Sequence, residues 1–149
     1  MKLLAVRTLV PLGAMLLAAC APNSKNAREA ALSPEETVAQ RAQARWDHLI
    51  ARDFAAAYDY LSPAFRQTRT RDAYAAEMSV RPLSWKSAKV DAVSCPQGEL
   101  HCDATILIEY QITVPVPSVG SVQGQTRVQE RWIESGDGWY HVPREIAGY

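Results

Sequence analysis

The stretch Cys-Asp-Ala-Thr-Ile-Leu-Ile-Glu-Tyr-Gln-Ile-Thr-Val, residues 102–114, decides the fold class of this chain. Successive side chains of a strand point to opposite faces, so a period of two separates the two faces. One face carries Cys102, Ala104, Ile106, Ile108, Tyr110, Ile112 and Val114. The intervening positions are polar except for Leu107. The pattern predicts a long antiparallel strand with one buried face.

Further strands are expected on both sides of this stretch. Residues 84–95 form a weaker strand pattern before it, and residues 122–134 form another after it. Ser135-Gly136-Asp137-Gly138 is typical of a tight turn, which would lead into a last strand over residues 139–145.

The region before residue 82 has a helical period instead. Ser33-Pro34-Glu35-Glu36 predicts a helix start, with Ser33 as the cap and Glu36 completing a capping box. Apolar residues then recur at helical spacing up to Ile50, which leaves Arg41, Arg45 and Arg52 facing water.

A second helix is expected from about Asp53 to Ser62, where Pro63 would end it, and a third over residues 72–78. Three helices followed by four antiparallel strands predict an α+β domain, with the helices packed on one face of the sheet.

The first 20 residues have the features of an export signal. Lys2 and Arg7 precede a short apolar run, and Leu17-Ala18-Ala19-Cys20 resembles the lipobox of bacterial lipoproteins. The resemblance implies removal of residues 1–19 and acylation of Cys20, for example by palmitate, which would anchor the chain to the membrane. The alternative is an ordinary secretory signal with an incidental cysteine.

The expected organisation is therefore a signal peptide over residues 1–19, a lipidated flexible tether over 20–32, and one α+β domain over 33–149. Ala21 stands where an aspartate would favour inner-membrane retention in lipoproteins of enteric bacteria. We therefore expect an outer-membrane anchor in the bacterial cell envelope, facing the periplasm.

Charge argues against one class of partner. Residues 1–19 contain two of the 16 basic residues and no acidic one, so the remainder carries 14 basic against 16 acidic residues. Nucleic-acid-binding domains are normally distinctly basic, so we expect no nucleic-acid partner.

The domain also resembles the nuclear transport factor 2-like superfamily. The segments that carry the resemblance are Trp46-Asp47-His48-Leu49-Ile50, Asp53-Phe54-Ala55-Ala56-Ala57-Tyr58, Leu61-Ser62-Pro63-Ala64-Phe65-Arg66, Arg131-Trp132-Ile133 and Gly138-Trp139-Tyr140. The resemblance covers about residues 35–145 and implies a cone around a curved sheet. It implies no particular activity, because that fold hosts enzymes, ligand binders and assembly modules alike.

Cys95 and Cys102 flank a turn-rich loop between two predicted strands, which predicts a hairpin disulfide in an exported protein. Two unpaired thiols are the main alternative. A zinc site that adds His101 is disfavoured, because adjacent strand residues point to opposite faces and no fourth ligand is evident. We expect no metal and no cofactor.

Glu130 is the most informative polar residue of the predicted sheet. It shares the parity of Val128 and Trp132, so an unbroken strand would turn it into the apolar interior, where a cavity carboxylate acts as a general base. It would then need a tyrosine, an arginine or a proton. The opposite parity of Ile133 favours a bulge that places Glu130 in water instead.

Large aromatic residues supply the other candidate pocket positions. Tyr58, Tyr110, Trp46 and Trp132 would line a pocket with Glu130, or else belong to the core, since aromatic side chains bury much area. No catalytic residue is identified, because nothing in the pattern arranges a histidine with a serine or an aspartate.

These observations favour a non-enzymatic envelope lipoprotein that binds a partner protein or a small apolar ligand. One alternative is a cyclase or isomerase with Glu130 as base and a tyrosine as acid. Another is a structural subunit of an envelope or secretion assembly, which would expose an apolar patch. A sheet face left open would favour a homodimer.

Overall fold

The computed structural model describes residues 32–114, 120–136 and 138–144. The expected signal peptide, Cys20 and all but the last residue of the expected tether lie outside the described residues. The elements, in chain order, are α2 (Pro34–Ile50), α3 (Phe54–Tyr58), α4 (Pro63–Thr68), α5 (Arg71–Ser79), β1 (Leu83–Ser94), β2 (His101–Thr113), β3 (Ser121–Ser135) and β4 (Gly138–Val142).

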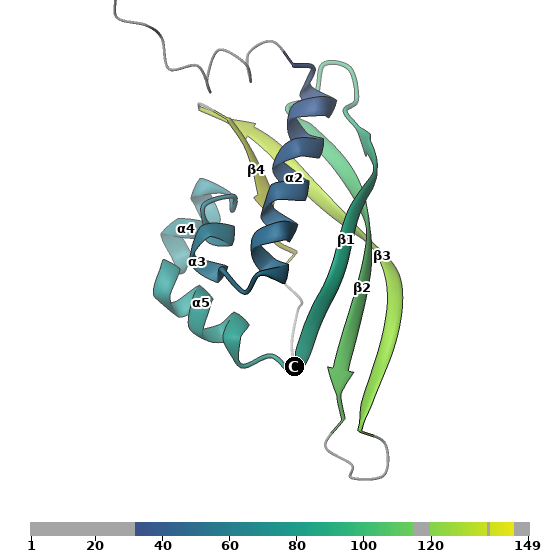
Figure 1. Cartoon of the computed structure of the whole chain (residues 1–149). Helices are drawn as coiled ribbons and strands as arrows, with labels where there is room; N and C mark the ends of the chain where they lie inside the picture. The colour runs from purple at the N-terminus through teal and green to yellow at the C-terminus, as the bar shows by residue number, and fades with distance from the viewer. Residues whose placement is uncertain (1–31, 115–119, 137, 145–149) are drawn as a thin grey trace, which may run out of the picture. The chain divides into compact units, whose positions relative to one another are not determined.

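The four strands form one antiparallel sheet in the order β1-β2-β3-β4, and Figure 1 shows the three long strands curving together. The alternation that predicted β2 is correct: Cys102, Ala104 and Ile106 are fully buried on one face. Burial of this face decreases toward the end of the strand, where Ile112 is 37% exposed. The predicted α+β class with a four-stranded antiparallel sheet is therefore confirmed.

The described residues contain four helices, not the three that were expected. α2 begins with the predicted capping box, in which Ser33 and Glu36 each bond the other's backbone N–H. The expected second helix is instead the short α3, and a separate helix, α4, follows it. Ser62 caps α4 by accepting from the Phe65 N–H, and Pro63 occupies its first turn. Proline at that position favours a helix start, which is why treating Pro63 only as a stop was wrong.

Helix α2 covers the concave face of the sheet, and α3, α4 and α5 lie beside it (Figure 1). The Gln43 side chain ties α2 to the edge strand β1: it donates to the Ala88 carbonyl at 3.0 Å and accepts from the Val90 N–H at 3.2 Å. These bonds satisfy backbone groups that an edge strand would otherwise leave open. The core lies between α2 and the sheet and continues under α3 and α5.

The β1–β2 hairpin is closed by the predicted disulfide. Cys95 and Cys102 are joined with a Cα–Cα distance of 4.2 Å, and Cys102 is fully buried. Both thiols are therefore used in the bond and are not available as zinc ligands. No cluster of potential metal ligands occurs within the described residues.

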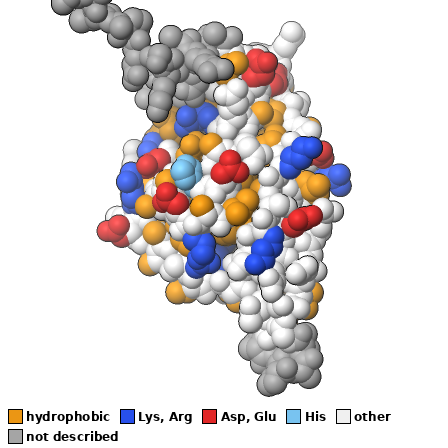
Figure 2. Space-filling model, in the orientation of Figure 1, with side chains coloured by type: hydrophobic (Ala, Val, Ile, Leu, Met, Phe, Trp, Pro, Cys, Tyr) orange, Lys and Arg blue, Asp and Glu red, His pale blue; other side chains and the backbone are white. Residues whose placement is uncertain are grey.

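The opposite face of the sheet is polar. Arg131 on β3 makes two 3.0 Å hydrogen bonds to Asp103 on β2, and these lower the pKa of the Asp103 carboxyl. Over the view in Figure 2, basic and acidic side chains are interspersed and do not form a patch of one sign. Among the described helices, none is long and apolar enough to cross a membrane.

Candidate functional site

A cavity of about 570 Å³ opens between the helices and the sheet. Its walls come from the C-terminal half of α2, from α4 and α5, and from the ends of β1 and β4 that approach them. The lining residues are Arg45, Trp46, Leu49, Leu61, Phe65, Thr68, Arg69, Tyr74, Glu77, Met78, Arg81, Trp85, His141, Pro143 and Arg144.

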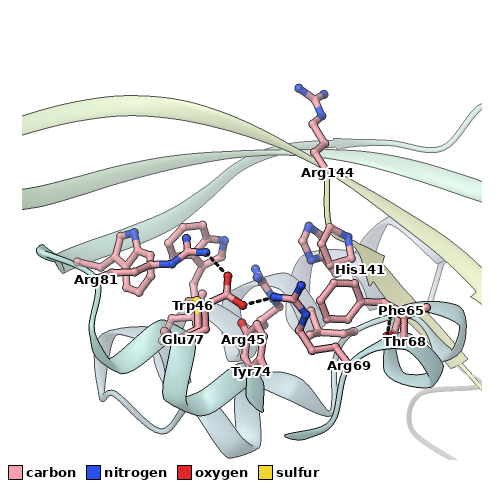
Figure 3. A pocket seen from close by; sticks show the side chains of 15 residues that line it. Arg45, Trp46, Phe65, Thr68, Arg69, Tyr74, Glu77, Arg81, His141 and Arg144 are labelled. Carbon is pink, nitrogen blue, oxygen red and sulfur yellow. Dashed lines mark hydrogen bonds and ion pairs between the residues drawn. The ribbon is translucent and has the colours of Figure 1, made fainter. Parts of the chain in front are cut away.

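Helix α5 presents one face to the cavity. Tyr74, Glu77 and Met78 are spaced i, i+3 and i+4, so their side chains lie on the same side of the helix. Arg69 precedes the helix and Arg81 follows it. The Glu77 carboxylate lies between these two guanidinium groups and pairs with both, at 3.2 Å in the case of Arg81 (Figure 3).

Aromatic rings form much of the apolar wall. Trp46 of α2 and Trp85 of β1 meet edge to face, with ring centroids 5.8 Å apart. Phe65 of α4 meets Tyr74 in the same geometry at 6.4 Å. Aromatic pairs held edge to face are favourable, so these contacts stabilise the apolar wall.

Behind the Trp46 wall lies a buried ion pair. The Arg45 Nη1 atom donates to Glu130 Oε1 at 2.7 Å, and the side chains are only 8% and 6% exposed. Two indoles complete the shell of the carboxylate: Trp46 Nε1 donates to Oε1 at 3.0 Å, and Trp132 Nε1 donates to Oε2 at 3.2 Å. Both carboxylate oxygens therefore have donors.

The register of β3 explains why Glu130 is buried. The β2–β3 ladder pairs every residue from Ser121 to Ile133 in turn, with Glu130 opposite Ala104. The bulge that the sequence favoured does not occur, so Glu130 keeps the inward parity of Trp132. Ile133, whose opposite parity suggested the bulge, is only partly buried.

His141 is held in place through its backbone. Its N–H donates to the Tyr60 carbonyl and its carbonyl accepts from the Ser62 N–H, both at 2.8 Å. These bonds attach β4 to the segment between α3 and α4. The ring is buried against Trp132, and its pKa is lowered well below the usual value, first by burial and then by the Arg45 charge. His141 is therefore neutral at neutral pH.

The predicted pocket residues occupy different places. Trp46 lines the cavity, whereas Glu130 and Trp132 lie behind its wall, joined to Trp46 through the carboxylate. The Tyr58 hydroxyl donates to the Arg69 carbonyl at 2.6 Å, and Tyr58 is not part of the lining. Tyr110 borders a separate, more open hollow on the sheet.

Tyr110 depends on a glycine in the neighbouring strand. Its ring lies directly over Gly124, where an added Cβ atom would be 2.6 Å from Tyr110 Cζ. The Tyr110 ring thus covers a position where a larger side chain would clash.

Of the lining residues, only Trp46 was identified from the sequence as a candidate pocket position; the missed ones include Arg45, Tyr74 and His141. Arg45 was expected to face water, but it is 7% exposed. The signal that could have found it is Glu130, because an inward carboxylate requires a cation or several donors. Nothing in the local pattern distinguished Tyr74 or His141 from ordinary core residues.

Arg66 lies in α4, Arg71 begins α5, and Arg69 lies between the two helices. Arg69 pairs with Glu77 and Arg71 pairs with Asp59, and all four side chains are at least 44% exposed. Arg66 lies over the Tyr140 ring, 5.3 Å from its centroid. Only Arg69 of these arginines lines the cavity.

The fold is similar to solved structures of SEC-C motif containing proteins. One from Psychrobacter arcticus matches with a TM-score of 0.55 and 11% identity, over 95% of this chain and 78% of that one. Another, from Rhodopseudomonas palustris, matches with a TM-score of 0.52 and 13% identity, over 69% of this chain and 73% of that one. The intermembrane space region of the chloroplast protein ARC6 gives a TM-score of 0.48 at 13% identity, over 75% of this chain and 95% of that one.

No protein-family model and no curated protein matches the chain. The expected relationship to nuclear transport factor 2-like domains is wrong, because the matching structures are SEC-C motif proteins. The segments that suggested it consist of core aromatics and turn residues, which many α+β domains need. The lipobox resemblance gains no support from a family model either.

Proposed function

We propose that this chain is an exported, lipid-anchored domain of the bacterial cell envelope that binds a small, largely apolar ligand without transforming it. The observation that carries the proposal is the cavity of about 570 Å³ with its aromatic walls. Small-molecule sites are typically concave, have volumes of about 300–1,000 Å³, and are lined mainly by apolar and aromatic side chains with a few polar groups.

The state of Glu130 supports binding over catalysis. A general base must reach the proton that it abstracts, but both Glu130 oxygens already accept from Arg45, Trp46 or Trp132. The carboxylate also lies behind the cavity wall and is not part of the lining. The cyclase or isomerase alternative therefore loses its proposed base.

The exposed apolar residues support binding over a structural role in an assembly. Four large apolar side chains are prominent on the described surface: Val80, Leu100, Ile112 and Val122. Of these, Ile112 and Val122 are partners in the β2–β3 register. A pair of side chains is much smaller than the contiguous apolar patches, larger than about 300–600 Å², that mark a protein interface.

The ligand site is tested with an uncharged fluorescent probe, N-phenyl-1-naphthylamine, excited directly and titrated into the purified full-length chain. Thr68→Trp places an indole at the lining, whereas Gln67→Trp places one at an exposed neighbour on the same helix outside the lining. We expect saturable emission enhancement, reduced at least tenfold in affinity by Thr68→Trp and retained in Gln67→Trp. Equal binding by both variants would exclude this cavity as the site.

The lipid anchor is proposed from the sequence of residues 1–20, which lie outside the described residues. In a bacterial host, the parent chain should partition with membranes and incorporate labelled palmitate. Cys20→Ser should abolish labelling and release the protein from the membrane fraction. If the variant partitions as the parent does, Cys20 is not the anchor. Fractionation of inner and outer membranes tests the expectation from Ala21.

A further inference from the structure

Three residues that line the cavity each have a buried polar atom without a hydrogen-bond partner. These atoms are Arg45 Nε, the Tyr74 hydroxyl and His141 Nδ1, and each residue is 7% exposed. Within the described residues, these are all of the buried side-chain nitrogen and oxygen atoms that lack a partner. All three residues line the same cavity.

This concentration is unusual for polar groups inside a protein. The large majority of buried polar atoms have a partner, because leaving one unsatisfied destabilises the fold. Here the unsatisfied atoms belong to residues of α2, α5 and β4, three elements far apart in the chain, and all three residues line one cavity. The common location points to a ligand that supplies the missing partners.

The charges around the cavity define the sign of that ligand. Arg45, Arg69 and Arg81 contribute three positive charges, which Glu77 and Glu130 offset by two. His141 contributes none, because burial and the Arg45 charge keep it neutral. Arg144 also lines the cavity, but it is exposed, and Figure 3 shows its guanidinium group directed away from the other labelled side chains. Without Arg144, one positive charge is left over.

We propose that the ligand is a monocarboxylate on an apolar body, with its carboxylate at Arg45 Nε and the Tyr74 hydroxyl, beside His141. The apolar body would lie along the Trp46 and Trp85 rings. The proposal rests on the proposed function and adds the chemical class of the ligand. The three polar atoms have almost no exposed surface in the free protein, so side chains at this wall must shift when the carboxylate enters.

Donor chemistry supports a carboxylate at this position. Arg45 Nε–H and the Tyr74 O–H are donors, and a carboxylate oxygen is a strong acceptor for both. An anion beside His141 would favour the protonated form of its ring. In that form Nδ1–H donates to the ligand and Nε2–H faces the Glu130 carboxylate, which lies 3.9 Å from Nε2 in the free protein.

The first test compares two probes of nearly equal shape, 1-naphthaleneacetate and the uncharged 1-naphthaleneacetamide, by calorimetry on the purified full-length chain. We expect the carboxylate to bind at least tenfold more tightly. Tyr74→Phe should reduce this preference to less than threefold with the affinity for the amide unchanged. Because the Tyr74 hydroxyl has no partner in the free protein, this variant should retain the melting temperature of the parent.

Tyr58→Phe is the matched control. Tyr58 packs against Tyr74, with ring centroids 5.8 Å apart, but its hydroxyl is bonded to backbone carbonyls and it does not line the cavity. Removing the Tyr58 hydroxyl should lower the stability of the protein and leave the preference for the carboxylate probe intact.

The second test follows the His141 ring by NMR titration with each probe. The charged groups that face this ring are Arg45 from α2 and Glu130 from β3. The carboxylate should raise the pKa of His141 and the amide should leave it unchanged, an effect that a merely structural Tyr74 would not produce.

The outcomes separate the two proposals. If both probes bind equally and Tyr74→Phe changes neither affinity, the carboxylate inference is overturned while the apolar site stands. If 1-naphthylmethyl phosphate, a dianion, binds more tightly than the carboxylate, the monoanion assignment is wrong. If neither naphthalene probe binds and N-phenyl-1-naphthylamine also fails, the proposed function falls together with the inference.

Discussion

Replacing Glu130 with glutamine measures how much of the fold depends on the buried ion pair. The change removes the negative charge that faces Arg45 at 2.7 Å. It also replaces one acceptor oxygen with an amide NH₂ group, a donor, which must then face another donor. Removing one partner of a buried pair leaves the other charge uncompensated, which typically costs about 3–5 kcal/mol. With roughly 4 °C lost per kcal/mol for a domain of this size, the melting temperature should fall by about 12–20 °C.

The assay is urea unfolding followed by fluorescence, with thermal melts by circular dichroism. Glu109→Gln is the matched control, since Glu109 is exposed on the polar face of the sheet and accepts from Ser87 and Gln125. This control should lose less than about 1 kcal/mol of unfolding free energy, because surface substitutions usually change stability little.

The double variant Arg45→Met with Glu130→Leu sharpens the result. Replacing both members of a buried pair with apolar residues is often close to neutral, so the double variant should be more stable than Glu130→Gln. If Glu130→Gln instead unfolds within about 1 kcal/mol of the Glu109→Gln control, the ion pair is not a main support of the core and the reasoning is refuted.

Three further predictions concern the scaffold. Non-reduced peptide mapping should show Cys95 cross-linked to Cys102, and reduction should cost about 2–3 kcal/mol for a loop of this length; freely alkylated thiols in the native protein would contradict it. Ile108→Ala should cost about 2–5 kcal/mol in urea unfolding, and Thr105→Ala on the opposite face well under half of that; equal losses would mean that both faces are covered. Because the folded pKa of His141 lies below its unfolded value, stability is full above about pH 6.5 and falls as pH decreases, by up to about 1.4 kcal/mol per pH unit. Urea unfolding of His141→Gln between about pH 7.5 and pH 5, a range that brackets the usual pKa of histidine, should lack this pH dependence. If the variant's unfolding free energy still changes with pH as the parent's does, His141 is not the source.

The sheet could be predicted from the sequence because its signals are local. The alternation from Cys102 to Ile108 shows which face of β2 is buried, and the glycine turn places the β3–β4 hairpin, with Gly136 at a φ of +60°. The capping box at Ser33 is equally local, since all of its bonds lie within three residues.

The candidate site could not be predicted in the same way because its contacts join distant segments. Whether Arg45 faces water depends on Glu130, which is 85 residues away in the chain. The register of β3 in turn depends on its pairing with β2, since parity within one strand does not exclude a bulge. The cavity is a space between packed elements, and no periodicity in the sequence reports such a space.

The four indole N–H signals test directly whether the cavity between α5 and the sheet binds a ligand. Trp46 and Trp85 line the cavity, whereas Trp132 and Trp139 do not. In ¹H–¹⁵N spectra titrated with 1-naphthaleneacetate, the Trp46 and Trp85 indole signals should shift saturably and by more than those of Trp132 and Trp139. Unmoved Trp46 and Trp85 signals at saturating probe, or shifts concentrated at Trp139, would contradict ligand binding in this cavity.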